Sequence, residues 1–160
     1  MTLAYVALGA NLGSPVVTVN AAIGHLDGIP LSRRLAGSSL YRTAPVGLKH
    51  QPDFINAVVA METELPAREL LDQLFAIEAH FGRQRSVPNA PRTLDLDLLL
   101  YGDLTLDTPA LMLPHPRMHE RAFVLAPLAE IAPALAIPGQ GRVADLLAAC
   151  ADQRIERIAP

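Results

Sequence analysis

The stretch from Leu94 to Tyr101, with the sequence Leu-Asp-Leu-Asp-Leu-Leu-Leu-Tyr, constrains the fold more than any other part of the chain. Leucines and aspartates alternate along it, and side chains that alternate in this way project from opposite faces of a β-strand. Asp95 and Asp97 therefore share one face, and the opposite face is predicted to be wholly apolar. The leucines expected on that apolar face are Leu94, Leu96, Leu98 and Leu100.

The aspartate pair suggests a metal site. Carboxylates two residues apart lie about 6.5 Å from one another along a strand, and like charges this close disfavour each other's ionised form. A cation beside them removes the repulsion. Mg²⁺ suits such hard oxygen ligands, because it usually takes one or two protein carboxylates and leaves room for phosphates. Arg92, just upstream, adds a guanidinium for phosphate oxygens, and together these residues indicate a phosphoryl-transfer site. Taken alone, the pair also fits a solvated strand face.

The composition places the chain among folded globular proteins. Its 160 residues fit one domain, predicted to span 1–160, and they are 51% hydrophobic and 18% charged. A net charge of −3 without a basic stripe argues against nucleic acid as a partner. The lone cysteine, Cys150, favours a reducing compartment, and we expect it to be a small buried apolar residue. Because we find no signal-peptide pattern and no apolar run of about 20 residues, we expect a cytoplasmic monomer that does not bind membranes.

The predicted elements follow the order β-α-β-β-α-β, which is that of the split βαβ, or ferredoxin-like, fold. This α+β fold has an antiparallel sheet with both helices on one face. Ser14 is expected to cap the first helix, with Pro15 at its first position, and Gly82 is expected to end the second. A proline-rich C-terminal extension should add helices near residues 120–130 and 142–151. The six elements before it are expected at residues 2–8, 15–26, 34–42, 54–62, 66–81 and 94–101.

This arrangement predicts where a cleft would lie. The leucine face of the last strand would meet the two helices, so the face that carries Asp95 and Asp97 would look out on the other side of the sheet. Loops 44–53 and 83–92 and the C-terminal region would then form the walls of the cleft.

Five further residues have more than one interpretation. Glu78 is either a surface acid at the edge of the apolar stripe of the second helix or a residue beside the cleft. Asn56 is unusual in a strand, so its amide is a candidate for ligand contact. Phe54 and Phe123 are either core residues or rings that stack on a planar ligand. His115 lies between two prolines, on a turn where core burial is not expected, and is a candidate for contact with phosphate or metal.

Six blocks of sequence follow one another along the chain. They are Ala7-Leu8-Gly9-Ala10-Asn11-Leu12-Gly13, Ser39-Leu40-Tyr41-Arg42-Thr43-Ala44-Pro45, Asp53-Phe54-Ile55-Asn56-Ala57, Glu78 with Gly82-Arg83, Pro91-Arg92-Thr93-Leu94-Asp95-Leu96-Asp97, and Pro114-His115-Pro116-Arg117-Met118. Six ordered blocks are far more specific than any one of them. With these blocks in this order, the chain resembles the 6-hydroxymethyl-7,8-dihydropterin pyrophosphokinases of folate biosynthesis. The fold of that family agrees with the split βαβ order.

The resemblance implies an ATP-dependent diphosphotransferase that moves pyrophosphate from ATP to the hydroxymethyl group of the pterin and releases AMP. It implies that Asp95 and Asp97 bind two Mg²⁺ ions and that ATP is the co-substrate. One ion would bridge the α- and β-phosphates. The other would bridge the β- and γ-phosphates and lower the pKa of the pterin hydroxyl. Catalysis would then rest on in-line positioning and on charge neutralisation, with Arg83 and Arg92 assisting the metal.

The resemblance also assigns the binding residues, and both ligands are small molecules. On the ATP side it assigns Glu78, Arg83, Arg85, Arg92, His115 and Arg121. On the pterin side, the ring would stack between Phe54 and Phe123. Its polar edge would be bonded by Asn56 and by the main chain of Thr43, Ala44, Pro45 and Val46.

Two other classes of function stay open. A different magnesium-dependent nucleotidyl or phosphoryl transferase could use the same aspartate pair. The second is a non-catalytic ferredoxin-like module that binds a small molecule. Such a module would not need two carboxylates on one exposed face, and its ligand binding would not depend on Mg²⁺.

Overall fold

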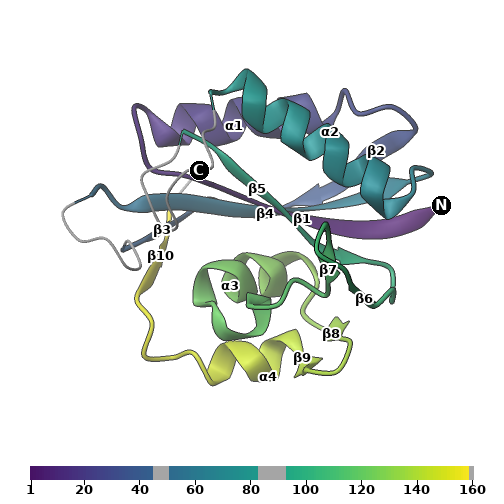
Figure 1. The fold of residues 1–160 in the computed structure, drawn as a ribbon. Coiled ribbons are helices and arrows are strands. Elements are labelled where there is room, and N and C mark those ends of the chain that lie inside the picture. Colours follow the sequence, from purple (N-terminus) through teal and green to yellow (C-terminus); the bar gives the residue numbers. More distant parts are fainter. Residues whose placement is uncertain (45–50, 83–92, 159–160) are drawn as a thin grey trace.

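The computed structural model describes residues 1–44, 51–82 and 93–158, which form a mixed α/β protein around an antiparallel sheet (Figure 1). The elements of the sheet and its first two helices are β1 (Thr2–Ala10), α1 (Pro15–Leu26), β2 (Ser32–Gly37), β3 (Tyr41–Thr43), β4 (Phe54–Thr63), α2 (Ala67–His80) and β5 (Asp95–Tyr101). After them come β6 (Leu106–Asp107), β7 (Met112–Leu113), the 3₁₀ helix η1 (Met118–Glu120), α3 (Ala122–Ile131), β8 (Ala136–Ile137), β9 (Gly141–Arg142), α4 (Val143–Ala148) and β10 (Ile155–Arg157). Within these ranges, no helix combines the length and the apolar character needed to cross a membrane.

The sheet is built around β1. β1 pairs with β4 on one side and with β5 on the other, and β4 pairs in turn with both β2 and β3. β10 pairs with β3 and forms one end of the sheet, while β5 lies at the opposite end. Every one of these pairings is antiparallel. Residues of β1 belong to the apolar cores on both faces of the sheet, among them Val6 and Leu8 on one face and Tyr5 on the other.

The single strand expected over residues 34–42 is wrong, because the chain forms two short strands there, β2 and β3, with a break at residues 38–40. Ser38 explains the break. Its backbone N–H donates to the carbonyl oxygen of Val58 at 2.9 Å, and its Oγ accepts the N–H of Val58 at 2.9 Å. A serine hydroxyl that takes a ladder hydrogen bond competes with the backbone acceptor of a regular strand, so the pairing is interrupted.

Helices cover both faces of the sheet (Figure 1). α1 and α2 lie on one face, as expected, and bury a core that includes Val19, Leu26 and Leu74. α3 and α4, from the C-terminal extension, lie on the other face over a second core that includes Leu125 and Leu128. Cys150 is buried in this second core, as predicted, and burial raises the pKa of its thiol. The second layer matters for function because it roofs the face of β5 that carries the aspartates.

The prediction that four leucines of β5 share one face is correct for three of them. Those that pack with α1 and α2 are Leu94, Leu96 and Leu98. Leu100 instead joins Leu99 in the core under α3. The pairing of β1 with β5 shifts register between Tyr5 and Val6, so one extra residue of β5 is accommodated there. A bulge of this kind reverses the alternation of side chains beyond it, and a period-two pattern cannot reveal it.

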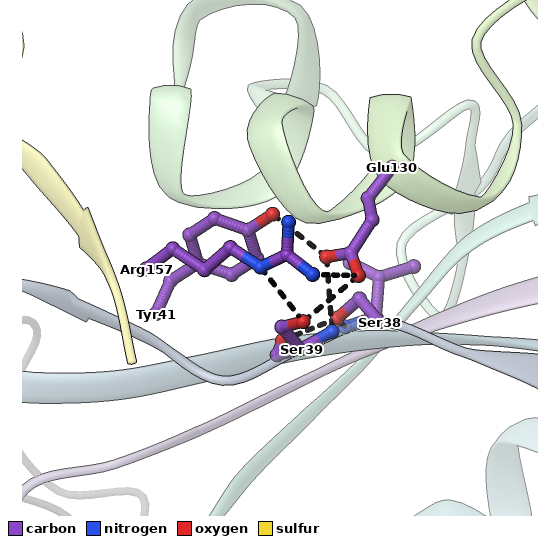
Figure 2. Close-up of polar contacts among 6 residues, drawn as sticks. Ser38, Ser39, Tyr41, Glu130 and Arg157 are labelled. Carbon is purple, nitrogen blue, oxygen red and sulfur yellow. Dashed lines mark hydrogen bonds and ion pairs between the residues drawn. The ribbon is translucent and has the colours of Figure 1, made fainter. Parts of the chain in front are cut away.

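A polar cluster fastens α3 to the edge of the sheet, and Figure 2 shows Glu130 reaching from the helix toward β3. The carboxylate of Glu130 accepts hydrogen bonds from the backbone N–H of Ser39 at 2.9 Å, from its hydroxyl at 2.8 Å and from the hydroxyl of Tyr41 at 2.7 Å. Arg157 of β10 completes the cluster, with its Nη2 3.4 Å from Glu130 and its Nε donating to Ser39 Oγ at 3.0 Å. α3, β3 and β10 are therefore held together at one place.

The cluster perturbs the acidity of two of its members. The pKa of Tyr41 is raised to about 12, first by burial and then by the neighbouring Glu130 carboxylate. Partial burial alone would raise the pKa of Glu130. The hydrogen bonds from Tyr41 and Ser39 and the charge of Arg157 outweigh it, so this pKa lies below its ordinary value.

We expect the substitution Glu130→Gln to destabilise the protein at neutral pH and to have a smaller effect in acid. A carboxyl whose pKa is lowered by folding stabilises the fold above its unfolded pKa, and that stabilisation is lost as the pH falls through the folded pKa. Urea unfolding of both proteins from pH 7 down to about pH 3 would measure the difference. Glu64→Gln, at an exposed position, is the matched control. A constant difference across this range would contradict the expectation.

Candidate active site

The largest concentration of the residues singled out from the sequence lies in one pocket, between the sheet and the start of α3. Its volume is about 810 Å³. The floor comes from β1, β4 and β5, and the roof comes from the segment between Pro114 and α3. The lining residues that the sequence singled out are Thr43, Ala44, Phe54, Asn56, Asp95, Asp97, His115, Arg121 and Phe123. The predicted cleft therefore exists on the predicted side of the sheet.

The aspartate pair is presented by a rigid element. Asp95 and Asp97 are half-buried, and on β1 they lie opposite Gly9 and Ala7. Both carboxylates line the pocket and come from the face of β5 opposite Leu96. Among residues 1–44, 51–82 and 93–158 no group of three or more His, Cys, Asp or Glu side chains is arranged to hold a metal. A two-carboxylate site suits Mg²⁺ bound together with phosphates, so the residues present fit that ion.

Glu78 is neither a surface acid nor a residue that lines the pocket. It is 1% exposed, and its Oε2 accepts the backbone N–H of Leu96 at 2.7 Å. Leu96 stands between the two aspartates, so this bond ties α2 to β5 at the point where the carboxylates are presented. A buried carboxylate is tolerated only where hydrogen bonds or charges compensate its desolvation, and this bond supplies one of them.

His115 is joined to β5 through its backbone. Its N–H donates to the carbonyl oxygen of Leu99 at 2.9 Å, and the peptide bond between Leu113 and Pro114 just before it is cis. The imidazole pKa is lowered to about 4, first by burial and then by the positive charges of Arg121 and Arg117, while Asp95 opposes the shift. The ring is therefore neutral at pH 7. Its Nδ1 accepts the N–H of Arg117 at 3.3 Å, which leaves Nε2 as the nitrogen that carries the proton and can donate.

Aromatic and amide side chains also line the pocket. Phe54 of β4 and Phe123 of α3 are half-buried and come from opposite walls, and aromatic faces of this kind suit a planar ligand. The guanidinium of Arg121 lies 5.4 Å from the centroid of the Phe123 ring, within the range of a cation–π contact. Asn56 is buried, and its Nδ2 donates to Thr43 Oγ1 at 2.9 Å. With Nδ2 turned toward Thr43, Oδ1 lies next to Gly9.

Five of the residues named from the sequence, Pro45, Val46, Arg83, Arg85 and Arg92, lie outside the residues that the structure describes. Four polar residues of the pocket were missed, namely Arg117, Glu120, Gln153 and Arg154. Arg117 stands in the block Pro-His-Pro-Arg-Met, so the sequence carried a signal for it. Gln153 and Arg154 come from a segment without any recognisable motif, and contacts with residues distant in sequence, such as the pairing of β10 with β3, bring that segment to the pocket.

We expect Glu78→Ala to destabilise the protein by about 2 to 3 kcal/mol, because it removes a buried, charge-assisted hydrogen bond to a backbone N–H. Glu78→Gln should cost less, since the amide keeps an acceptor oxygen for Leu96. Denaturant unfolding would measure both. Glu69→Ala, at an exposed position on the same helix, should change stability by less than about 0.5 kcal/mol. Equal losses for Glu78→Ala and Glu69→Ala would show that the buried bond is not stabilising.

A family model and individual relatives identify the same family. The model of the 7,8-dihydro-6-hydroxymethylpterin-pyrophosphokinase (HPPK) family matches residues 5–133. The 2-amino-4-hydroxy-6-hydroxymethyldihydropteridine pyrophosphokinase of Pseudomonas aeruginosa is 47% identical over 154 residues, covering 96% of this chain and 95% of that protein. The enzyme of the same name from Haemophilus influenzae is 41% identical over 160 residues, covering 100% of both.

Solved structures agree on the fold. The crystal structure of a wild-type Plasmodium falciparum HPPK-DHPS with SDX-DHP matches with a TM-score of 0.70 and 16% identity, over 93% of this chain. The matched region is 43% of that longer chain, so this chain spans less than half of it. At an identity this low, the match supports a similar fold and nothing more. The sequence matches, which span most of the chain, carry the assignment: the chain belongs to the 7,8-dihydro-6-hydroxymethylpterin-pyrophosphokinase family.

Proposed function

We propose that the chain transfers pyrophosphate from ATP to the hydroxymethyl group of 6-hydroxymethyl-7,8-dihydropterin, giving AMP and the pterin diphosphate in folate biosynthesis. The family and the relatives at 41% to 47% identity support this reaction. The structural observation that carries it is the content of one pocket. Asp95, Asp97, His115 and Arg121 line the same pocket as Phe54, Phe123 and Asn56. The first group suits a metal with phosphates, and the second suits a flat polar ring.

Asp95 and Asp97 are the proposed metal ligands, and the proposed number of Mg²⁺ ions is two. Bound there, Mg²⁺ would neutralise phosphate charge and lower the pKa of the pterin hydroxyl. The contribution of the chain is to hold both carboxylates on one face of a strand that is paired with β1 and fixed from behind by Glu78. The family resemblance assigns Glu78 to the nucleotide side. Its burial supports a positioning role for it there rather than direct contact with ATP.

The phosphates of ATP are proposed to be held by His115 and Arg121, together with Arg83, Arg85 and Arg92. The neutral imidazole of His115 can donate from Nε2 to a phosphate oxygen without bringing a second positive charge beside Arg121. Arg121 lines the same pocket, with its guanidinium over the Phe123 ring, and offers a forked donor for phosphate oxygens. Arg83 and Arg92 are the proposed catalytic arginines, as in the family resemblance.

The pterin is proposed to stack between Phe54 and Phe123 and to bond with Asn56 and with the main chain of residues 43–46. Gly9 supports this role for Asn56. A Cβ at Gly9 would lie 3.1 Å from Asn56 Oδ1, closer than most real Cβ contacts, so the glycine gives the amide oxygen its room. With Nδ2 bonded to Thr43, the amide can change its position only by breaking that bond.

Three broader expectations remain proposals. The strand order β5-β1-β4-β3, with neighbours antiparallel, supports a split βαβ, or ferredoxin-like, sheet to which β10 and a C-terminal layer are added. Contacts between both layers and the sheet support a single domain over residues 1–160. A monomer in the cytoplasm, acting on small molecules and not on nucleic acid, stays a prediction from the sequence. A non-catalytic binding module would leave the aspartate pair without a purpose.

We expect Asp97→Ala to lower pterin-dependent AMP release from MgATP by roughly a thousandfold, because the phosphates then lose a fixed metal ligand. The measurement is AMP formation with and without 6-hydroxymethyl-7,8-dihydropterin. Asp103→Ala, at an exposed position just after the same strand, should keep the wild-type rate. Release of ADP in place of AMP by the wild-type chain would sink the proposed reaction, and full activity of Asp97→Ala would sink the metal site.

We expect Gly9→Ala to raise the KM for the pterin roughly tenfold with little change in the KM for ATP, because the new methyl group displaces the amide of Asn56. Steady-state kinetics with each substrate varied in turn would test this. Gly24→Ala in α1 is the matched control, since a Cβ there meets nothing within 4 Å. Equal changes in both KM values would show that the effect of the substitution is not confined to pterin binding, and would contradict the proposed specific contact between Asn56 and the pterin.

A further inference from the structure

The side chain of Gln153 forms a bridge across the backbone of Arg121. Its Nε2 donates to the carbonyl oxygen of Glu120 at 2.7 Å, and its Oε1 accepts the N–H of Ala122 at 2.9 Å. These two backbone groups flank Arg121, whose conformation is extended, with φ −117 and ψ 111. One side-chain amide thus bonds the backbone on either side of one residue, as the N–H and C=O of one residue in a neighbouring parallel strand would.

The bridge lies at the junction between two helical segments. Residues 118–120 form η1 and α3 begins at Ala122, so Arg121 is the single extended residue between two helical segments. Arg121 is the N-cap of α3, and its side chain makes no capping hydrogen bond. The first N–H groups of a helix lack partners within the helix. Gln153 supplies the partner for Ala122 from 31 residues further along the chain.

Arg121 and Phe123 depend on this corner for their direction. Both line the pocket, one on each side of Ala122, and the Arg121 guanidinium lies over the Phe123 ring. A small rotation of the backbone at Arg121 would move the guanidinium and the ring together. The side-chain amide of Gln153 restrains that rotation, because both of its bonds require the present peptide orientations.

Gln153 is itself held at fixed points on either side. Before it, Cys150 is buried, and the backbone N–H of Gln153 donates to the Cys150 carbonyl oxygen at 3.0 Å. After it, Ile155 pairs with Thr43 at the start of β10, and Arg157 joins the Glu130 cluster at the far end of α3. The segment that carries Gln153 therefore contacts α3 at both of its ends. This segment lies beyond residues 5–133, which the family model matches.

We propose that Gln153 is a positioning residue for the site, acting through Phe123 on the pterin side and, to a smaller extent, through Arg121 on the phosphate side. The proposal rests on the proposed function for the nature of the ligand. It extends that function to the C-terminal segment, which contributes no catalytic group. Loss of the bridge should loosen the stacking wall and leave the aspartate pair unchanged, since Asp95 and Asp97 are held by β1 and Glu78.

The test compares Gln153→Ala and Gln153→Glu with the wild-type chain in steady-state kinetics. We expect Gln153→Ala to raise the KM for the pterin about tenfold through Phe123, and to raise the KM for ATP by a smaller factor through Arg121, since two neutral hydrogen bonds are lost. Gln153→Glu keeps the acceptor for Ala122 and loses the donor to Glu120, so its effect should be intermediate. Gln140→Ala, an exposed glutamine in the turn between β8 and β9, is the control and should match the wild type.

A double-mutant cycle with Phe123→Ala separates positioning from general loss of stability. If Gln153 acts through Phe123, then Gln153→Ala should add less than about twofold to the pterin KM in a chain that already lacks the ring. Independent effects that multiply, or an unchanged KM in the single variant, would overturn the proposal.

Hydrogen exchange gives a readout that needs no turnover. The Ala122 amide proton should exchange faster in Gln153→Ala than in the wild type, and an unchanged rate would overturn the bridge itself. If the wild-type chain releases no pterin-dependent AMP, the proposed function fails separately. Pterin affinity, followed by the fluorescence of the pterin, then replaces the KM in the same cycle, and an unchanged affinity in Gln153→Ala would overturn the positioning role.

Discussion

The arrangement of β5 against β1 is the constraint on which the rest of this structure depends. A strand with leucines on one face and two aspartates on the other can be buried on its apolar side only if its acidic side faces solvent, a cation or both. The antiparallel pairing with β1 sets the direction of those side chains, and Glu78 fixes the same strand from the helix layer. The C-terminal layer then does not cover the aspartates completely but leaves a pocket above them.

The pocket is a product of two layers that differ in how they are attached. The layer of α1 and α2 packs through a continuous apolar core that reaches from Ala4 to Leu113. The layer of α3 and α4 has an apolar core of its own, and it is also fixed by directed polar contacts at both ends of α3, from Gln153 at one end and around Glu130 at the other. Directed contacts specify orientation more narrowly than apolar packing does. This difference suits a wall that must present Arg121 and Phe123 at defined angles.

Much of this architecture could be predicted because it depends on local patterns. The period of two in β5, the stripe of Leu70, Leu74 and Ile77 in α2, and Gly82 with its left-handed φ of +81 after that helix are all readable from neighbouring residues. The bulge that turns Leu100 to the other face, the hydroxyl of Ser38 that divides β2 from β3, and the burial of Glu78 depend on partners far away in sequence. Ser14, expected to cap α1, lies at the N-cap without a side-chain bond. Gln153 was beyond prediction for the same reason, because its partners are backbone groups, which every residue has.

The hydrogen bonds that hold β5 also have an effect at the outer boundary of the sheet. β5 is the last strand on its side, and an unpaired edge of this kind would offer its N–H and C=O groups to any extended chain nearby. Here the N–H of Leu96 is taken by a carboxylate from α2, and the carbonyl of Leu99 is taken by the N–H of His115. The hydrogen bonds that position the aspartates and the histidine at the pocket therefore also occupy backbone groups at the outer edge of β5. A second copy of the chain could not extend the sheet by pairing with β5 without first displacing residues of the site.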